Sequence, residues 1–224
     1  LTKTGAGSYY LVNTTVGDGD IQVTGRSLIL SKGGGGSTGP RIQGTGMITI
    51  GDGAGNGTLS VDSAQTAGLI TRPITLDGGT IVSTGTALID SPVTIAAGGG
   101  VLDGRAAYLN MSGPISGSGP LSLLGNPVWA GLMGGTSGYS GVATLTGNLQ
   151  MCNAGGDGGS AAAAFVMNPG AVFLCSNEAG TTTVSMGSLS GSGTLAGSGY
   201  VATRNGTKTL TIGGRNEDST FSGA

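Results

Sequence analysis

Residues 115–125 read ISGSGPLSLLG, a short Ser/Gly stretch followed almost at once by an apolar run. Such a stretch is typical of a flexible linker or of a tight corner in a regular structure. Similar stretches begin at positions 42 (IQGTGMITI) and 189 (LSGSGTLAGS), so both intervals are about 73 residues long, and a near-constant interval indicates a repeat. We therefore interpret ISGSG as a corner, with Ile115 in the core, glycines that permit the bend, and Leu121 and Leu123 in the next inward-facing strand.

Two further elements recur along the chain. VTIAAGGGVL at 93–102 matches FVMNPGAVFL at 165–174, at nearly the same interval. GDIQV at 19–23, GGTIV at 78–82 and GNLQM at 147–151 form a looser set. A period near 73 is too long for one coil of a solenoid, but it fits three coils of about 24 residues. With coils stacked about 4.8 Å apart, we expect about nine coils and a rod of roughly 40–45 Å.

The composition favours many short strands joined by glycine-rich turns. The 224 residues include 49 Gly and 7 Pro, but 37% are hydrophobic and only 9% are charged, unlike a disordered chain. Mean hydropathy is +0.20. Leu149 and Met151 alternate with Gln150, the pattern of a strand with one face in the core. We expect an all-β chain with one domain over residues 1–224, as a segment of a longer solenoid or as a fibre subunit.

Several stretches resemble the autotransporter-associated β-strand repeat of Gram-negative surface proteins. They are LTKTGAG at 1–7, GYSGVATLTGNLQ at 138–150, GSLSGSGTL at 187–195 and LTIGGRNEDSTFSGA at 210–224. The resemblance implies a right-handed parallel β-helix of the passenger type, secreted and displayed outside the cell or on the surface of a Gram-negative-type bacterium. The chain departs from the usual pattern in the extra glycine run at 33–36 and around Pro127, Val128 and Trp129.

The residue inventory argues against catalysis. The sequence contains no histidine, the commonest general base and transition-metal ligand. Paired carboxylates could still perform acid–base chemistry. The candidate pairs are Asp18 with Asp20, Asp77 with Asp90 or Asp103, and Glu217 with Asp218. Most of them lie beside Gly or Asn, where Asp ordinarily supports a turn. We therefore predict no enzyme activity and no catalytic residues.

Metal and cofactor sites are not predicted either. The Gly/Asp stretches at 51–57 and 155–159 do not recur in tandem, as calcium-binding β-roll repeats do. The glycine-rich stretch at 33–39 does not contain the Lys of a phosphate-binding loop. We interpret all three stretches as plain loops and expect no cofactor.

Two kinds of residue are singled out as candidate sites. The interval between Cys152 and Cys175 is close to one coil of about 24 residues. One coil apart in register, their Cα atoms would be about 4.8 Å from each other, within reach of a disulfide. The alternative is a stacked pair of free thiols. Trp129 is a candidate contact for a partner or a glycan if exposed, and the alternative is burial beneath a loop.

Two functional hypotheses follow. The first is a structural, non-catalytic extracellular β-helix that acts as a surface stalk, adhesin or fibre segment. Its partners would be neighbouring β-helix segments or identical subunits end to end, together with cell-surface glycans. The alternative is a polysaccharide-binding or polysaccharide-cleaving β-helix, in which Asp77, Asp103 and Arg105 would converge on one outer face.

Charge and hydropathy exclude other partners. The net charge is −2 and no basic cluster is present, so we expect no nucleic-acid partner. No apolar run approaches the roughly 20 residues that span a bilayer, so we expect no membrane insertion. The first residues, LTKTGAG, do not have the pattern of a signal peptide, and we expect a mature fragment of a longer protein.

Overall fold

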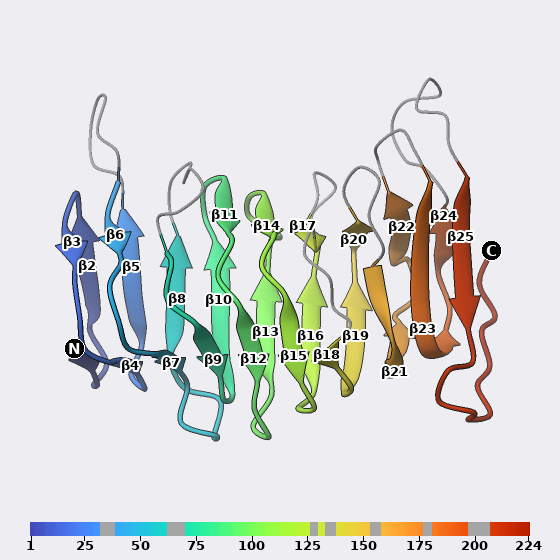
Figure 1. The fold of residues 1–224 in the computed structure, drawn as a ribbon, viewed down its shortest axis with the longest axis horizontal. Coiled ribbons are helices and arrows are strands. Elements are labelled where there is room, and N and C mark those ends of the chain that lie inside the picture. The colour runs from blue at the N-terminus through green and yellow to red at the C-terminus, as the bar shows by residue number, and fades with distance from the viewer. Residues whose placement is uncertain are drawn as a thin grey trace.

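The computed structural model describes residues 1–31, 39–61, 70–125, 130–132, 138–152, 158–176, 181–196 and 207–224. Within these residues every regular element is a β-strand, and neighbouring strands pair in parallel. Figure 1 shows the strands side by side along one axis, with the N- and C-termini at opposite ends. Strands that are neighbours in a sheet are not consecutive in sequence, because the chain visits the other sides before it returns. The predicted parallel β-solenoid is confirmed.

The solenoid has three sides, called A, B and C here in the order in which the chain visits them. Side A is a seven-stranded sheet of β1 (Thr2–Lys3), β4 (Ile21–Val23), β7 (Ile48–Ile50), β9 (Ile74–Leu76), β12 (Val93–Ile95), β15 (Ile115–Gly117) and β18 (Gly138–Tyr139). Side B is a ten-stranded sheet of β2 (Ser8–Val12), β5 (Ser27–Ser31), β8 (Thr58–Val61), β10 (Gly79–Ser83), β13 (Gly100–Asp103), β16 (Leu121–Leu124), β19 (Val142–Thr146), β21 (Gly158–Met167), β23 (Thr182–Gly191) and β25 (Lys208–Ile212).

Side C consists of two sheets. The first is the pair β3 (Thr15–Val16) and β6 (Arg41–Ile42), which a bridge between Ile42 and Ile70 extends by one coil. The second is a six-stranded sheet of β11 (Ala87–Ile89), β14 (Leu109–Met111), β17 (Ala130–Leu132), β20 (Asn148–Cys152), β22 (Val172–Ser176) and β24 (Thr194–Ala196). The Ser91 hydroxyl donates to the Ile70 carbonyl, so a side-chain bond joins the two sheets.

The strand register measures the length of each coil. Ile21 pairs with Ile48, Ile48 with Ile74, Ile74 with Val93, and Val93 with Ile115. The mean interval between these partners is about 24 residues, as expected for a coil of this kind. The interval from Ile74 to Val93 is the shortest of the four and that from Ile21 to Ile48 the longest. Coil length therefore varies while the strands remain in register, because the difference is taken up in the connections.

The number of coils differs slightly from the nine expected. Ten strands stack on side B, whereas side A has seven and the longer sheet of side C has six. Near the C-terminal end the strands become longer: β21 and β23 have ten residues each. The pairing of β21 with β23 shifts between Ser160 and Ala164, and β21 also contacts β18 of side A. One long strand thus passes a corner that separates sides A and B in earlier coils.

Ladders of aliphatic side chains fill the interior. On side A the inward positions Ile21, Ile48, Ile74, Val93 and Ile115 are in register and at most 1% exposed. Side B contributes an equivalent ladder of Leu28, Leu59, Ile81, Leu102, Leu123 and Leu145. Burial of such a side chain stabilises the folded chain by about 1.5–3 kcal/mol. The outward ladder on side A is polar, with Gln22, Thr49, Thr75, Thr94 and Ser116.

A corner is confirmed at ISGSG, where residues 118–120 join β15 to β16. Ile115 is 1% exposed, and Leu121 and Leu123 are 3% and 2% exposed at the start of the next strand. Gly117 has a φ of 100°, a left-handed conformation that favours glycine, and a side chain there would overlap the backbone of Ile95. This glycine is therefore required both by the bend and by the close approach of the coil below.

The recurring corner does not occupy one fixed place in the coil, however. Ile42 lies on side C before a corner that leads to side A, Ile115 lies on side A, and Leu189 lies on side B. The set at 19–23, 78–82 and 147–151 likewise moves from side A to B to C. The interpretation of the period as three whole coils was wrong. One period advances the chain three coils and one further side, because every side uses the same strand–corner–strand unit.

Candidate functional site

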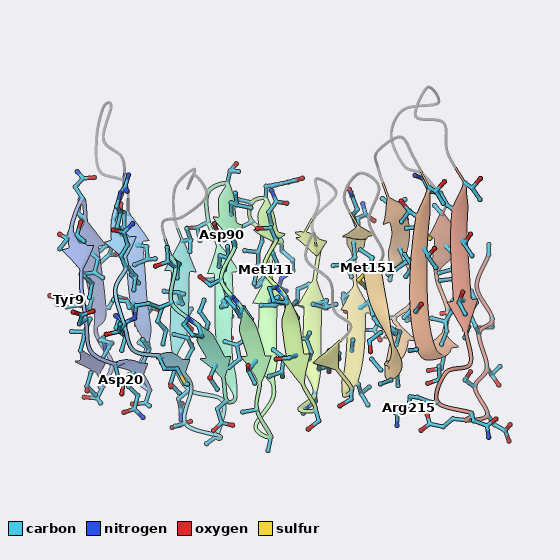
Figure 2. The ribbon with its side chains drawn as sticks, in the orientation of Figure 1. Tyr9, Asp20, Asp90, Met111, Met151 and Arg215 are labelled. Atoms are coloured by element: carbon cyan, nitrogen blue, oxygen red, sulfur yellow. The ribbon has the colours of Figure 1, made fainter. Side chains whose placement is uncertain are left out.

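The first candidate carboxylate pair, Asp18 and Asp20, stabilises a corner. Asp18 Oδ1 accepts hydrogen bonds from the Thr45 backbone N–H at 2.7 Å and the Thr45 hydroxyl at 3.0 Å. Asp20 Oδ1 accepts from the Met47 N–H at 2.9 Å; Figure 2 shows Asp20 in the first coils. The bonds from Thr45 hold the pKa of Asp18 below its ordinary value. Both carboxylates thus tie one coil to the next, which is a structural task.

The second set does not come together. Asp77 precedes β10 on side B, and its Oδ1 accepts from the Gly98 N–H at 2.9 Å. Asp103 lies at the other end of the same side, where β13 ends in register with Val82. There Arg105 Nη2 lies 2.8 Å from Asp103 Oδ2. The convergence of Asp77, Asp103 and Arg105 that the polysaccharide alternative requires is not found, because opposite ends of a strand separate Asp77 from the other two.

Asp90 and Asp103 lie on different elements. Asp90 follows β11 on side C, as the label in Figure 2 shows. Burial acts to raise the pKa of the Asp103 carboxyl, but the hydrogen bonds from Arg105 outweigh it and the pKa is lowered. A carboxylate held ionised by a neighbouring guanidinium is a poor proton donor at neutral pH.

Arg215 and Glu217 form an ion pair. Figure 2 labels Arg215 near the C-terminal end of the solenoid. Arg215 Nη2 lies 2.6 Å from Glu217 Oε1, and Arg215 Nε donates to the same oxygen at 2.8 Å. Arg215 Nη1 also donates to the carbonyls of Ser140 and Ala162, at 3.3 and 3.4 Å. The guanidinium therefore joins segments from three coils and lowers the pKa of Glu217. The carboxylate of Glu217 therefore serves as the ion-pair partner of Arg215.

Buried Arg72 makes a set of hydrogen bonds to the backbone that the sequence did not predict. This side chain is 1% exposed and donates to the carbonyls of Gly17 at 2.9 Å, Gly46 at 3.3 Å, Met47 at 3.3 Å and Gly19. Its acceptors belong to two successive connections between sides C and A. An Arg beside Pro73 in a weakly charged chain was the only signal in the sequence.

Of the two cysteines that could have formed a disulfide, Cys175 is a free thiol. It is 5% exposed, and its burial raises the pKa of the thiol. The pairing of β20 with β22 places Cys152 opposite Ser176, one residue away from Cys175. The backbone register therefore offsets the two cysteines by one residue. The spacing of the cysteines in sequence was correct for a coil but not for this register.

Trp129 and the glycine run at 33–36 lie outside the described residues. Among the residues that are described, no group of three or more His, Cys, Asp or Glu side chains could hold a metal ion. Within the same residues, no helix is long and apolar enough to cross a membrane.

The described surface contains an open groove that sequence reasoning also missed. It lies where side A turns into side B in the first three coils, and it is lined by Gly5, Ala6, Thr24, Gly25, Arg26, Gly55, Asn56, Gly57 and Thr58. A side chain at Gly25 or Gly57 would overlap the backbone of Gly5 or Val23, so glycine lets these corners stack closely. The sequence signal was the alignment of GAG, TGR and GNGT, which becomes visible only when the register is known.

One side chain of the groove is held in place. Asn56 Nδ2 donates to Asp52 Oδ2 at 2.8 Å, while Asp52 Oδ1 accepts from the Ala54 N–H at 3.0 Å. These bonds lower the pKa of Asp52. The segment 51–57 is therefore an ordered turn whose carboxylate is already engaged.

Comparison with known proteins gives one relationship. Over 155 residues the chain is 32% identical to the Adhesin BmaC autotransporter of Brucella suis biovar 1 (strain 1330). This chain is similar to an autotransporter adhesin. The match covers 69% of this chain but only 4% of that protein, so the chain spans a small part of its relative. This match agrees with the resemblance to an autotransporter-type repeat. No family model matches the chain, and no solved structure matches it significantly.

Proposed function

We propose that this chain is a structural, non-catalytic segment of a larger surface protein of a Gram-negative-type bacterium, and that it acts outside the cell as an adhesin-like stalk. The observation that carries the proposal is the 32% identity over 155 residues to an autotransporter adhesin. The fold suits this role because the strands of each coil pair with those of the adjacent coils, so length can be added coil by coil.

The chemistry of the described side chains supports a role without catalysis. The candidate carboxylates Asp18, Asp20 and Asp77 accept backbone hydrogen bonds that stabilise connections between coils. Asp103 and Glu217 are each paired with an arginine. A general acid must donate a proton to the substrate and a general base must accept one from it, so either group must face a substrate site, whereas these carboxylates face backbone or a cation.

Adhesion can be measured directly with the purified chain on beads. We expect beads coated with the native chain to be retained on epithelial cell layers under flow. Beads coated with the same chain after heat unfolding are the matched control, and they should be washed away. Equal retention of the two preparations would contradict the adhesive part of the proposal.

End-to-end stacking of copies is a finer proposal of the same kind. Among the described strands, the outermost members of side B, β2 and β25, each have one unpaired edge. An unpaired strand edge can pair with another strand, whether from a further coil or from a second copy. Electron microscopy over a concentration series tests this. We expect filaments that lengthen with concentration. Uniform single particles at high concentration would contradict end-to-end stacking but not the stalk itself.

A further inference from the structure

We infer that the groove at the corner between sides A and B binds a sugar residue that bears a carboxylate, within a longer glycan. The inference rests on the adhesive function proposed above, and it names the site and the ligand class. It starts from Arg26, which lines the groove and is exposed. In the described part of the chain, the Arg26 guanidinium has no carboxylate or carbonyl partner, whereas Arg72, Arg105 and Arg215 are all engaged.

A second cation lies beside the same groove. Lys3 Nζ donates to the carbonyls of Thr4 at 2.6 Å and Gly5 at 3.0 Å, and Gly5 lines the groove. An ammonium group has three N–H donors, so these two bonds leave one for a ligand. The carboxylate of Asp52, in the same turn as Asn56, is held by Asn56 and by backbone N–H groups. The charge that remains available to a ligand at this corner is therefore positive.

Neutral polar groups complete the lining. The bond from Asn56 Nδ2 to Asp52 fixes the amide and leaves the second N–H and Oδ1 of Asn56 for a ligand. Thr24 and Thr58 contribute hydroxyl groups, which both donate and accept. A guanidinium binds a carboxylate through two parallel hydrogen bonds, while hydroxyl and amide groups match the hydroxyls of a sugar ring. An inorganic anion alone would use only the cations.

An exposed aromatic ring extends the surface along side B. Tyr10 is 59% exposed and points outward, because its neighbour Leu11 is buried in the core. The register pairs Ser8 with Ser27 and Ser27 with Thr58, so Tyr10 lies two residues and two coils from Thr58. Strand rise and spacing make this separation about 12 Å. A glycan held at Arg26 could thus place a further sugar on the face of Tyr10.

The experiment uses isothermal titration of the full chain with three probes. Sialyllactose and a hyaluronan tetrasaccharide carry a carboxylate on different sugars, and lactose is the neutral counterpart. We expect at least one acidic probe to bind at least tenfold more tightly than lactose. The two acidic arms tell a sialic acid from a hexuronic acid as the source of the carboxylate.

Two variants in the same coil locate the site. Arg26→Gln removes the charge but keeps hydrogen-bonding capacity, and it should weaken binding of the acidic probe at least tenfold. Arg41→Gln is the matched control, since Arg41 on β6 has no side-chain partner among the described residues and lies on side C. It should leave the affinity unchanged. No preference for the acidic probes, or an equal loss in both variants, would overturn the inference.

The failure of this inference can be told apart from failure of the adhesive function. If native beads adhere to cells while no acidic probe binds, the groove is not a glycan site but adhesion stands. If native beads do not adhere, the adhesive function fails whatever the titrations show. Circular dichroism of Arg26→Gln checks that the exposed substitution leaves the fold intact.

Discussion

Substitution of Arg72 by Met tests how the first coils are held together. Arg72 is buried and donates to four backbone carbonyls, those of Gly17, Gly19, Gly46 and Met47. Methionine keeps an aliphatic side chain of similar reach and removes only the guanidinium. The variant therefore isolates the hydrogen bonds from the packing of the side chain.

The expected loss can be worked out from the acceptors. A hydrogen bond to a charged group contributes about 1.5–3 kcal/mol net. Two of the four are long at 3.3 Å, so they contribute less. Gly17 and Gly19 lie at the surface, and water can replace part of what their carbonyls lose. We expect Arg72→Met to lower the free energy of unfolding by about 3 kcal/mol, which equals two charge-assisted hydrogen bonds at the low end of that range.

Urea unfolding gives the magnitude, and hydrogen exchange gives the location. Coils interact mainly with adjacent coils, so amide protection should fall in residues 17–31 and 39–50 and persist in the strands β19 to β25. Arg41→Met is the matched control, and it should change stability by no more than about 0.5 kcal/mol. If both variants lose the same stability, or if protection falls evenly along the chain, Arg72 does not hold these coils together.

Three further predictions concern single residues. Hydrogen bonds from Thr45 lower the pKa of Asp18 from 3.8, so the stability that this carboxylate contributes is present above that value and is lost as pH falls through the lowered pKa. In an acid titration, the free energy of unfolding of Asp18→Asn should therefore decline less steeply with falling pH than that of the native chain. Gly117→Ala should cost about 3 kcal/mol in urea unfolding, against about 1 kcal/mol for Gly170→Ala, whose positive φ is not accompanied by a clash. In a Cys152→Ser background, Cys175 should react with iodoacetamide only after unfolding, and rapid labelling of the native chain would contradict its burial.

The sequence predicted the parallel solenoid because coil geometry leaves a local trace. Alternation of apolar and polar residues marks strands such as Asn148–Cys152, and a left-handed glycine such as Gly117 marks a corner. These signals depend on neighbours in the chain. The alternation and the corner glycines are present whichever coil a strand pairs with. For this reason the mean coil length could be predicted from the sequence.

The register and the site depend on contacts between coils and were not predictable in this way. Cys152 and Cys175 had the right spacing but fell one residue out of register. Asp77 and Asp103 had plausible chemistry but lie at opposite ends of side B. The groove depends on which glycine corner lies above which, and connections of variable length hide that alignment in the sequence.

The movement of the repeated motif from one side to the next has a consequence for how such a chain grows. Duplication of one full period would not place each surface feature directly above its copy. It would rotate the copy onto the adjoining side, so that outward groups wind around the rod like a screw thread. A protein lengthened in this way presents the same chemistry in several directions, which suits contact with a partner whose angle of approach is not fixed.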